Sequence, residues 1–265
     1  HHLFAELLRN RLARAYPEQI PNLHRRASDW YASNDWMGEA ITHAMAVGDW
    51  QRAAELIERV FRSMWMRGEI SILRDWLEAF PSEIRRERLA LGLVYAWTLT
   101  LTNQLDRAEQ HLDQVMPRAP TTPAILGELL AIRAMIAAYR SDMSAVIELT
   151  QQALTLVPRE ETFLRSAIML SLGFAYDDVS GDIVAAKRAF TDAFALGKTL
   201  TLGKITGNNP IALTALAQLA ELEWLQGHLH AGFEMYAQAL ELAEQWGGQS
   251  FVAVSRVQWG RAILL

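Results

Sequence analysis

Hydrophobic residues recur at three- and four-residue spacing along nearly the whole chain, and this spacing predicts α-helices. Residues 213–224 give a clear example, with five apolar side chains on one helix face: Leu213, Leu216, Ala217, Ala220 and Trp224. No stretch alternates convincingly between apolar and polar residues, and no Asn-Gly or Asp-Gly turn signals a hairpin. The pattern therefore predicts an all-α protein.

The helices are predicted to be paired, because turn residues interrupt the pattern at short intervals. In residues 23–58 the breaks are Asn34-Asp35 and Gly48-Asp49. Small residues lie where neighbouring helices must approach closely: Ala27, Ala40, Ala44, Ala53 and Ala54. Such a series is typical of a helical array, a class that binds other molecules more often than it catalyses a reaction.

A repeat emerges when five turn residues are each taken as an origin: Gly48, Asn103, Ser141, Gly181 and Gly227. The residues five, nine and twelve positions later are mostly small, large and small, in three sets: Ala53, Ala108, Val146, Ala186 and Gly232; Ile57, Leu112, Thr150, Phe190 and Tyr236; Val60, Val115, Ala153, Ala193 and Ala239. This order is typical of the second helix of a tetratricopeptide (TPR) repeat, although Thr150 departs from it and the turns are more widely spaced than ~34 residues. We therefore predict a right-handed superhelix of TPR-like antiparallel helix pairs, an α-α superhelix.

Three further segments complete the predicted organisation. An additional helix pair surrounds Gly68, and its second helix ends at Phe80-Pro81. The uncharged run from Leu89 to Leu105 predicts a helix buried on nearly all sides. Residues 197–210 form the longest predicted loop, after which Asn209-Pro210 restarts a helix with Asn as the N-cap.

Composition excludes several functional classes. The chain has 265 residues, no cysteine and a formal net charge of −5. Nucleic-acid binding depends on Lys and Arg side chains that neutralise phosphates, so direct contact with nucleic acid is not expected. The longest uncharged run is shorter than the ~20 apolar residues that a membrane span needs, so no membrane contact is expected. The absence of cysteine fits a reducing cytoplasm.

The first part of the chain carries a specific likeness. HHLFAELLRNRL (1–12) and LHRRASDWYASNDWMGEAITHAMAVGDWQRAAELIE (23–58), continued by RGEISILRDWLEAFP (67–81) and LVYAWTLTLTNQLDRAEQHL (93–112), resemble MalT-like regulators of the LuxR family. These are ATP-dependent transcriptional activators of the STAND class, and beyond residue 112 the likeness is that of a generic TPR array. The resemblance implies that residues 1–22 end a winged-helix or linker region, 23–85 form atypical short pairs at the start of a sensor arm, and 86–265 form TPR-like repeats.

The same resemblance implies a function. Neither GKT at 197–199 nor GK at 203–204 completes a phosphate-binding loop, so no cofactor is expected in this chain. The ATPase and DNA-binding domains would lie outside it. The expected role is that of an inducer-sensing domain whose partners are a small molecule, such as a sugar or an aromatic metabolite, the other domains of the same protein, and a further copy through self-association. The alternative is a protein-interaction scaffold without a small-molecule ligand.

Candidate ligand-binding residues follow from the turn alignment, because the first helix of each TPR pair lines the concave groove. Four aromatic and two acidic residues fall near that lining: Trp97, Tyr139, Tyr176, Trp224, Glu128 and Glu221. Asp177 joins them from an acidic cluster with Asp178 and Asp182. The alternatives are that each aromatic residue is a packing residue and that Asp182 caps the next helix while the other two carboxylates are solvated.

No residue pattern points to catalysis or to a metal. The chain shows no Ser/His/Asp arrangement and no paired-carboxylate motif, so we expect it not to be an enzyme. His228 and His230 are two positions apart and therefore point to different sides of a helix, and no metal ligand set is assigned. His24 and His43 are expected at contacts between helices.

Overall fold

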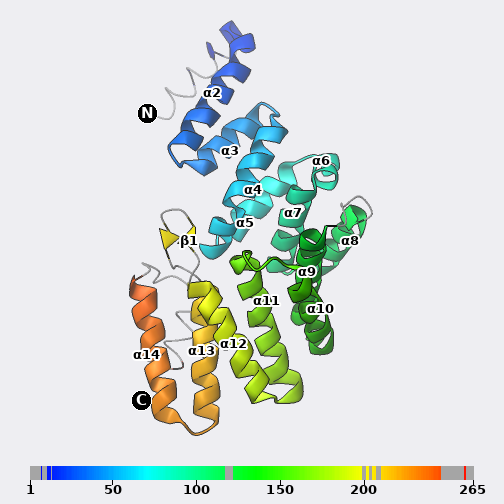
Figure 1. Ribbon diagram of the computed structural model, residues 1–265. Coiled ribbons are helices and arrows are strands. Elements are labelled where there is room, and N and C mark those ends of the chain that lie inside the picture. Colours follow the sequence, from blue (N-terminus) through cyan, green and yellow to red (C-terminus); the bar gives the residue numbers. More distant parts are fainter. Residues whose placement is uncertain are drawn as a thin grey trace.

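The computed structural model describes residues 7, 11–12, 14–116, 122–198, 201–202, 205–206, 210–245 and 260. The described part is almost entirely helical, as predicted (Figure 1). Its helices, in chain order, are η1 (Pro17–Gln19), α2 (Ile20–Ser33), α3 (Met37–Ala46), α4 (Trp50–Met66), α5 (Ile70–Ala79), α6 (Ser82–Glu87), α7 (Leu89–Leu101), α8 (Leu105–Val115), α9 (Pro123–Tyr139), α10 (Met143–Leu156), α11 (Thr162–Ala175), the π-helical turn η3 (Tyr176–Ser180), α12 (Ile183–Lys198), α13 (Pro210–Leu225) and α14 (Leu229–Gln245).

The predicted turns lie where one helix ends and the next begins. All five residues used as repeat origins have a positive φ, as do Asp35 and Gly68, with values between 54° and 84°. This left-handed conformation closes a helix and reverses the chain, and Gly, Asn and Asp adopt it at the lowest cost. The predicted break around Gly68 is also present, between α4 and α5.

Aspartate side chains begin several of the second helices. Asp49 accepts a hydrogen bond from the backbone N–H of Arg52, and Asp182 accepts one from that of Ala185 at 3.0 Å. Such a cap satisfies one of the N–H groups that a helix start leaves unpaired. For Asp182 the capping alternative is therefore confirmed.

The small–large–small positions form the contact between the helices of each pair. All fifteen of these residues are buried. The large Phe190 of α12 packs against Gly173 of α11, where an added Cβ would lie 2.5 Å from the ring. Thr150 departs from the pattern. Its hydroxyl donates a hydrogen bond to the backbone oxygen of Val146 at 2.6 Å, so no unsatisfied polar group is buried there.

Successive pairs stack into a right-handed superhelix of TPR-like units. The first helices α7, α9, α11 and α13 each contact the next one, and the second helices α8, α10 and α12 contact the first helix that follows them. The end of α4 also reaches across to this layer, because Met66 shares a hydrophobic cluster with Phe163 of α11 and Ile211 of α13. The first helices therefore form one continuous layer, which α4 joins from the amino-terminal side.

Helix α7 is buried on nearly all sides, as predicted for the uncharged run. Every residue from Leu91 to Thr100 is buried. The hydroxyls of Thr98 and Thr100 donate to the backbone oxygens four residues earlier. Among the described helices, none combines the length and the apolar character that crossing a lipid bilayer requires.

The segment between α12 and α13 differs from the helical expectation at one point. Two short strands, β1 (Thr201–Leu202) and β2 (Ile205–Thr206), pair antiparallel in this segment. Their β-branched residues favour an extended backbone once the helix has ended. Helix α13 begins at Pro210 as predicted, whereas the predicted cap Asn209 and the connector 117–121 lie outside the described residues.

Candidate functional site

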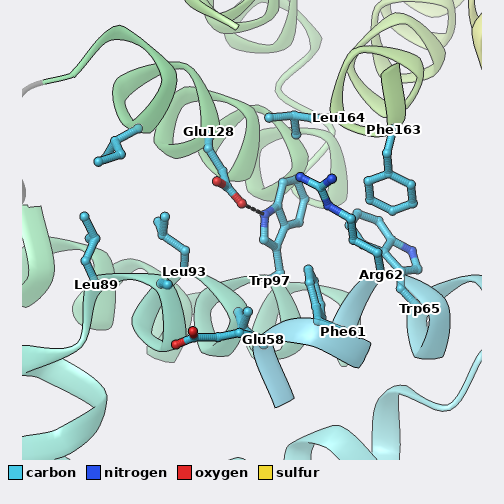
Figure 2. Close-up of a pocket in the computed structure, with 13 residues that line it drawn as sticks. Glu58, Phe61, Arg62, Trp65, Leu89, Leu93, Trp97, Glu128, Phe163 and Leu164 are labelled. Carbon is cyan, nitrogen blue, oxygen red and sulfur yellow. Dashed lines mark hydrogen bonds between the residues drawn. The ribbon is translucent and has the colours of Figure 1, made fainter. Parts of the chain in front are cut away.

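Two cavities lie along helices α9 and α11. The first cavity, of about 300 Å³, is bounded by α4, α7, α9 and α11 (Figure 2). Its lining consists of Glu58, Phe61, Arg62, Trp65, Leu89, Ala90, Leu93, Val94, Trp97, Ile125, Glu128, Phe163 and Leu164. Three helices supply the polar groups that could hold a ligand. Helix α4 carries a carboxyl, a guanidinium and an indole group, α7 carries an indole, and α9 carries a carboxyl.

Aromatic rings in edge and tilted contacts form one wall of the first cavity. The ring centroids of Trp65 and Trp97 are 5.0 Å apart, and those of Trp65 and Phe163 are 4.9 Å apart with the rings nearly perpendicular. Phe61 contacts Trp65 from the same helix, at 5.7 Å. Aromatic pairs prefer these arrangements, so the rings of the wall stabilise one another without a ligand.

Glu128 places a carboxyl group against this wall. The indole Nε1 of Trp97 donates a hydrogen bond to its Oε1 over 3.1 Å (Figure 2). Protein surrounds the carboxyl on most sides, although part of the side chain faces the cavity. This burial raises the pKa of Glu128, and the indole hydrogen bond and the charge of Arg62 offset the effect only in part.

The other charged groups of the first cavity are paired. Arg62 donates to Glu161 at 2.6 Å, and its guanidinium carbon lies 5.7 Å from the centre of the Phe163 ring. Arg88 makes a bidentate contact with Glu58, at 2.6 Å and 2.9 Å. This combination of flat aromatic faces, one half-buried carboxyl and paired charges suits a ring-shaped polar ligand. Hydroxyl or amino groups of such a ligand could hydrogen-bond to Glu128.

The second cavity, of about 550 Å³, lies towards the other ends of α9 and α11. Its lining consists of Met135, Ala138, Tyr139, Met143, Leu170, Ser171, Phe174, Asp177, Asp178, Gln218 and Glu221. The residues come from α9, the start of α10, α11, η3 and α13. In this cavity every charged lining residue that the structure describes is acidic.

The carboxylates of the second cavity lie close enough to repel one another. The pKa of Asp177 is raised, first by burial and then by the charges of Glu221 and Asp178. Gln218, which is 4% exposed, donates from its amide nitrogen to Glu221 Oε2 at 2.8 Å. A positive ligand group would relieve the repulsion between these carboxylates.

The structure divides the seven predicted ligand-binding residues between different places. It brings Trp97 and Glu128 together in the first cavity. Three others meet in the second cavity: Tyr139, Asp177 and Glu221. Whether any of them contacts a ligand stays a prediction.

Tyr176 and Trp224 line neither cavity. Tyr176 packs beside a cluster formed by α12 and α13, and its hydroxyl accepts a hydrogen bond from Gln151 Nε2 at 3.1 Å. Trp224, in the last turn of α13, lies next to Gly232 of α14. Of the two neighbours in this turn, only Asp177 belongs to the lining of the second cavity.

Sequence reasoning missed most of the first cavity. Trp65 and Arg62 lie on α4, and Phe163 begins α11. The alignment by turns placed the groove on the first helix of each pair, whereas α4 is a second helix that packs against α7 and reaches α11. The spacing of Phe61 and Trp65, one helical turn apart, was the available signal.

The histidine expectation is confirmed for one pair. The Nδ1 atoms of His24 and His43 lie 2.8 Å apart at the contact between α2 and α3. Among the described residues, no group of three His, Cys, Asp or Glu side chains is arranged to hold a metal ion.

Fold and cavities together define a helical-repeat protein of the TPR-like class, with its candidate sites on the inner helices. The family described as the MalT-like TPR region matches residues 127–265, and the chain belongs to this family. The match covers the part that the sequence analysis described as a generic TPR array, so that description was too coarse.

The chain is also similar to parts of longer relatives and to a solved structure. The serine/threonine-protein kinases PknK of Mycobacterium tuberculosis (strain H37Rv) and Mycobacterium bovis are 26% identical to this chain, over 97% of it. The chain spans only 27% of the length of these relatives. The crystal structure of the APC/C hetero-tetramer Cut9–Hcn1 matches with a TM-score of 0.61 and 15% identity, over 96% of this chain and 45% of that one. That likeness concerns the fold alone.

Proposed function

We propose that this chain is the inducer-sensing arm of a MalT-like, LuxR-family transcriptional regulator. The first cavity carries the proposal, because it combines a preformed aromatic wall with a half-buried carboxyl that is hydrogen-bonded to an indole. The family assignment and the resemblance of residues 1–112 to the start of a sensor arm support it. In this proposal the chain performs no catalytic step and holds no cofactor.

The proposed mechanism is a shift between two arrangements of the arm. A ligand in the first cavity contacts α4, α7, α9 and α11 at once, so it favours the arrangement in which these helices are close. Attached ATPase and DNA-binding domains, outside this chain, then respond to the change. A ligand that binds one arrangement a hundredfold more tightly supplies about 2.7 kcal/mol for the shift.

A ligand screen tests this proposal. Thermal unfolding is measured with a panel of oligosaccharides, amino acids and aromatic metabolites, using tryptophan fluorescence. We expect at least one compound to raise the unfolding temperature of the unaltered chain. Trp97→Phe keeps an aromatic ring but removes the N–H that binds Glu128, so it should lose most of this effect. Trp30→Phe, at an exposed position, is the matched control.

The second candidate function is a scaffold for a protein partner. The solved neighbour Cut9–Hcn1 is a hetero-tetramer, so an array of this fold is found there in an assembly with a partner protein. Failure of every compound in the screen, together with capture of a stoichiometric partner from extract, would replace the sensor proposal with this one. Sedimentation analysis of the same sample distinguishes a partner from a second copy of the chain.

A further inference from the structure

A third cavity, of about 170 Å³, lies where α6, α7 and α8 meet. Clefts that hold drug-sized ligands enclose about 300–1,000 Å³, so this cavity suits a smaller group. Three guanidinium groups border it, those of Arg85, Arg86 and Arg107. No Asp or Glu belongs to its described lining, although the net charge of the chain is −5. The charge of the lining therefore favours an anion.

The three guanidinium groups differ in how they are neutralised. Arg86 lies 3.1 Å from the carboxylate of Glu83, and Arg107 lies 2.9 Å from that of Glu78, and neither carboxylate lines the cavity. Arg85 forms no ion pair with any residue that the structure describes. The charge of Arg85 is thus the one that an entering anion would neutralise.

Arg85 also keeps one edge of its guanidinium group free. Its Nη1 donates to the backbone oxygens of Leu77 and Phe80, where α5 ends. Its Nε and Nη2 donate to no described residue, and neither atom is enclosed by protein. The Nε and Nη2 groups of arginine form a planar pair of donors that matches two oxygens of one oxyanion. The centre of the Tyr95 ring lies 4.8 Å from the guanidinium carbon and supports this edge.

Two further polar side chains of the third cavity are more than nine-tenths buried. Tyr95 is 5% exposed and His111 is 7% exposed. The Tyr95 oxygen accepts a hydrogen bond from Arg107 at 2.8 Å, and its own O–H has no acceptor in the described part of the chain. The only described side-chain polar atom that is enclosed without a partner belongs to Arg52, outside this cavity, so an occupant can reach the Tyr95 hydroxyl.

His111 supplies a hydrogen-bond acceptor to the same cavity. Its Nε2 donates to the backbone oxygen of Gly92 at 3.1 Å, so Nδ1 of the neutral ring is an acceptor. The pKa of His111 is lowered to about 4, first by burial and also by the charges of Arg85 and Arg86, so the ring is neutral at pH 7. The rings of Tyr95 and His111 are 5.0 Å apart, which makes Arg85, Tyr95 and His111 neighbours.

From these observations we infer that the third cavity binds inorganic phosphate, as the hydrogen phosphate ion. Two phosphate oxygens accept from the free edge of Arg85, and a third accepts from the Tyr95 hydroxyl. The P–OH group donates to Nδ1 of His111. Sulfate carries no proton at neutral pH and lacks this last contact. The site lies outside the first cavity, so the inference stands independently of the proposed function.

Titration calorimetry with sodium phosphate tests the inference. The full chain is measured at pH 7 and about 150 mM salt, where weak attraction to surface charges is screened. We expect saturable binding of one phosphate per chain. Sodium sulfate should bind at least about tenfold more weakly, which corresponds to ~1.4 kcal/mol.

A matched pair of arginine variants separates the ligand contact from a structural role. Arg85→Lys keeps the positive charge but removes the two-donor edge, so it should weaken phosphate binding at least about tenfold. Arg165 also donates from Nη1 to backbone oxygens where a helix ends, those of Leu154 and Val157 at the end of α10, yet it does not line the cavity. Arg165→Lys should therefore leave the affinity within about twofold.

A third variant reports on the site even if Arg85→Lys folds poorly. Tyr95→Phe keeps the ring beside Arg85 and removes only the hydroxyl, without a change of charge. It should weaken phosphate binding at least about threefold, because a hydrogen bond to an ion is lost. Circular dichroism checks that each variant is folded.

Several results would overturn the inference. Equal affinity for sulfate would show a general anion site rather than a phosphate site. Equal losses in Arg85→Lys and Arg165→Lys would show that contacts at helix ends, and not the free edge of Arg85, control binding. Tighter binding of glycerol 3-phosphate than of inorganic phosphate would replace the free ion with a phosphate ester, and the absence of any saturable heat would refute the site.

Discussion

The two cavities use the same pair of helices but present opposite chemistry. At the first cavity, α9 and α11 contribute Glu128 and Phe163 from their amino-terminal turns. At the second cavity, Met135 and Leu170 come from later turns of the same helices. The third wall differs, because α4 brings aromatic rings and a paired arginine to one site, whereas η3 and α13 bring carboxylates to the other. Neighbouring segments rather than the repeat itself therefore determine what each site can bind.

The largest expected difference concerns the cost of truncating a wall residue. Trp97 is 2% exposed, so Trp97→Ala should reduce the free energy of unfolding by ~3–5 kcal/mol. Tyr139, at the second cavity, is 47% exposed, and Tyr139→Ala should cost less than about 1 kcal/mol. Urea unfolding followed by circular dichroism measures both. Equal losses would contradict the difference in burial between these two wall residues.

Acidification should destabilise the contact between α7 and α8, and α7 is the helix that carries Trp97. His111 of α8 is buried, and its Nε2 donates to the backbone oxygen of Gly92 on α7, the helix that carries Trp97. Burial lowers the pKa of His111 from 6.5 to about 4. The unfolded chain therefore binds more protons between these values, and about 3 kcal/mol of stability present above pH 6.5 should be lost as the pH falls through 4.

Urea unfolding at several pH values between 7 and 4 checks this expectation. Carboxylates titrate in the same range, so the informative quantity is the difference from His111→Gln, which can still donate to Gly92. The variant should lose less stability on acidification than the unaltered chain. Identical slopes would mean that His111 is charged in the folded protein.

A third prediction concerns the helix that both cavities share. Gly173 lies on α11, and an added Cβ would approach the Phe190 ring to 2.5 Å. Gly173→Ala should therefore reduce stability by ~1–3 kcal/mol, although Ala is ordinarily the better helix residue. Gly38→Ala is the matched control, since its Cβ would meet nothing closer than 3.8 Å. A more stable Gly173→Ala chain would show that α11 and α12 are not packed this closely.

The smallest expected effects differ in sign between the cavities. Glu58→Gln breaks a bidentate pair with Arg88 at the first cavity, and it should reduce stability by about 1 kcal/mol or less. Asp177→Asn removes a carboxylate whose pKa is raised by burial and by like charges, so it should slightly raise the unfolding temperature near pH 7. Thermal unfolding of both variants measures the signs. Two changes in the same direction would contradict the electrostatic contrast.

Local features of the fold were predictable from the sequence. The turns at Gly48, Asn103, Ser141, Gly181 and Gly227 depend on one residue adopting a left-handed conformation, so the sequence alone locates them. The small–large–small order depends on contacts within one helix pair and is equally local. The short strands β1 and β2 were missed, because two-residue pairing leaves too little alternation to detect.

The candidate site was predictable only in part. Trp97 and Glu128 were named, but their neighbours on α4 were not, since the approach of Trp65 to Phe163 spans nearly a hundred residues of chain and depends on the curvature of the superhelix. Tyr176 was placed with Asp177, but Tyr176 packs beside the cluster of α12 and α13, whereas Asp177 lines the second cavity. The turn alignment identified single residues, but it could not predict which distant helices come together.

The sharing of α9 and α11 has a thermodynamic consequence. An occupant of either cavity that displaces these helices alters the affinity of the other cavity, and by linkage the two effects are equal in size. The early turns of α9 and α11 line the first cavity and their later turns line the second cavity. Occupants of the two cavities would therefore act on the positions of the same two helices. In the proposed sensor, the binding equilibrium at one cavity would therefore depend on how fully the other cavity is occupied.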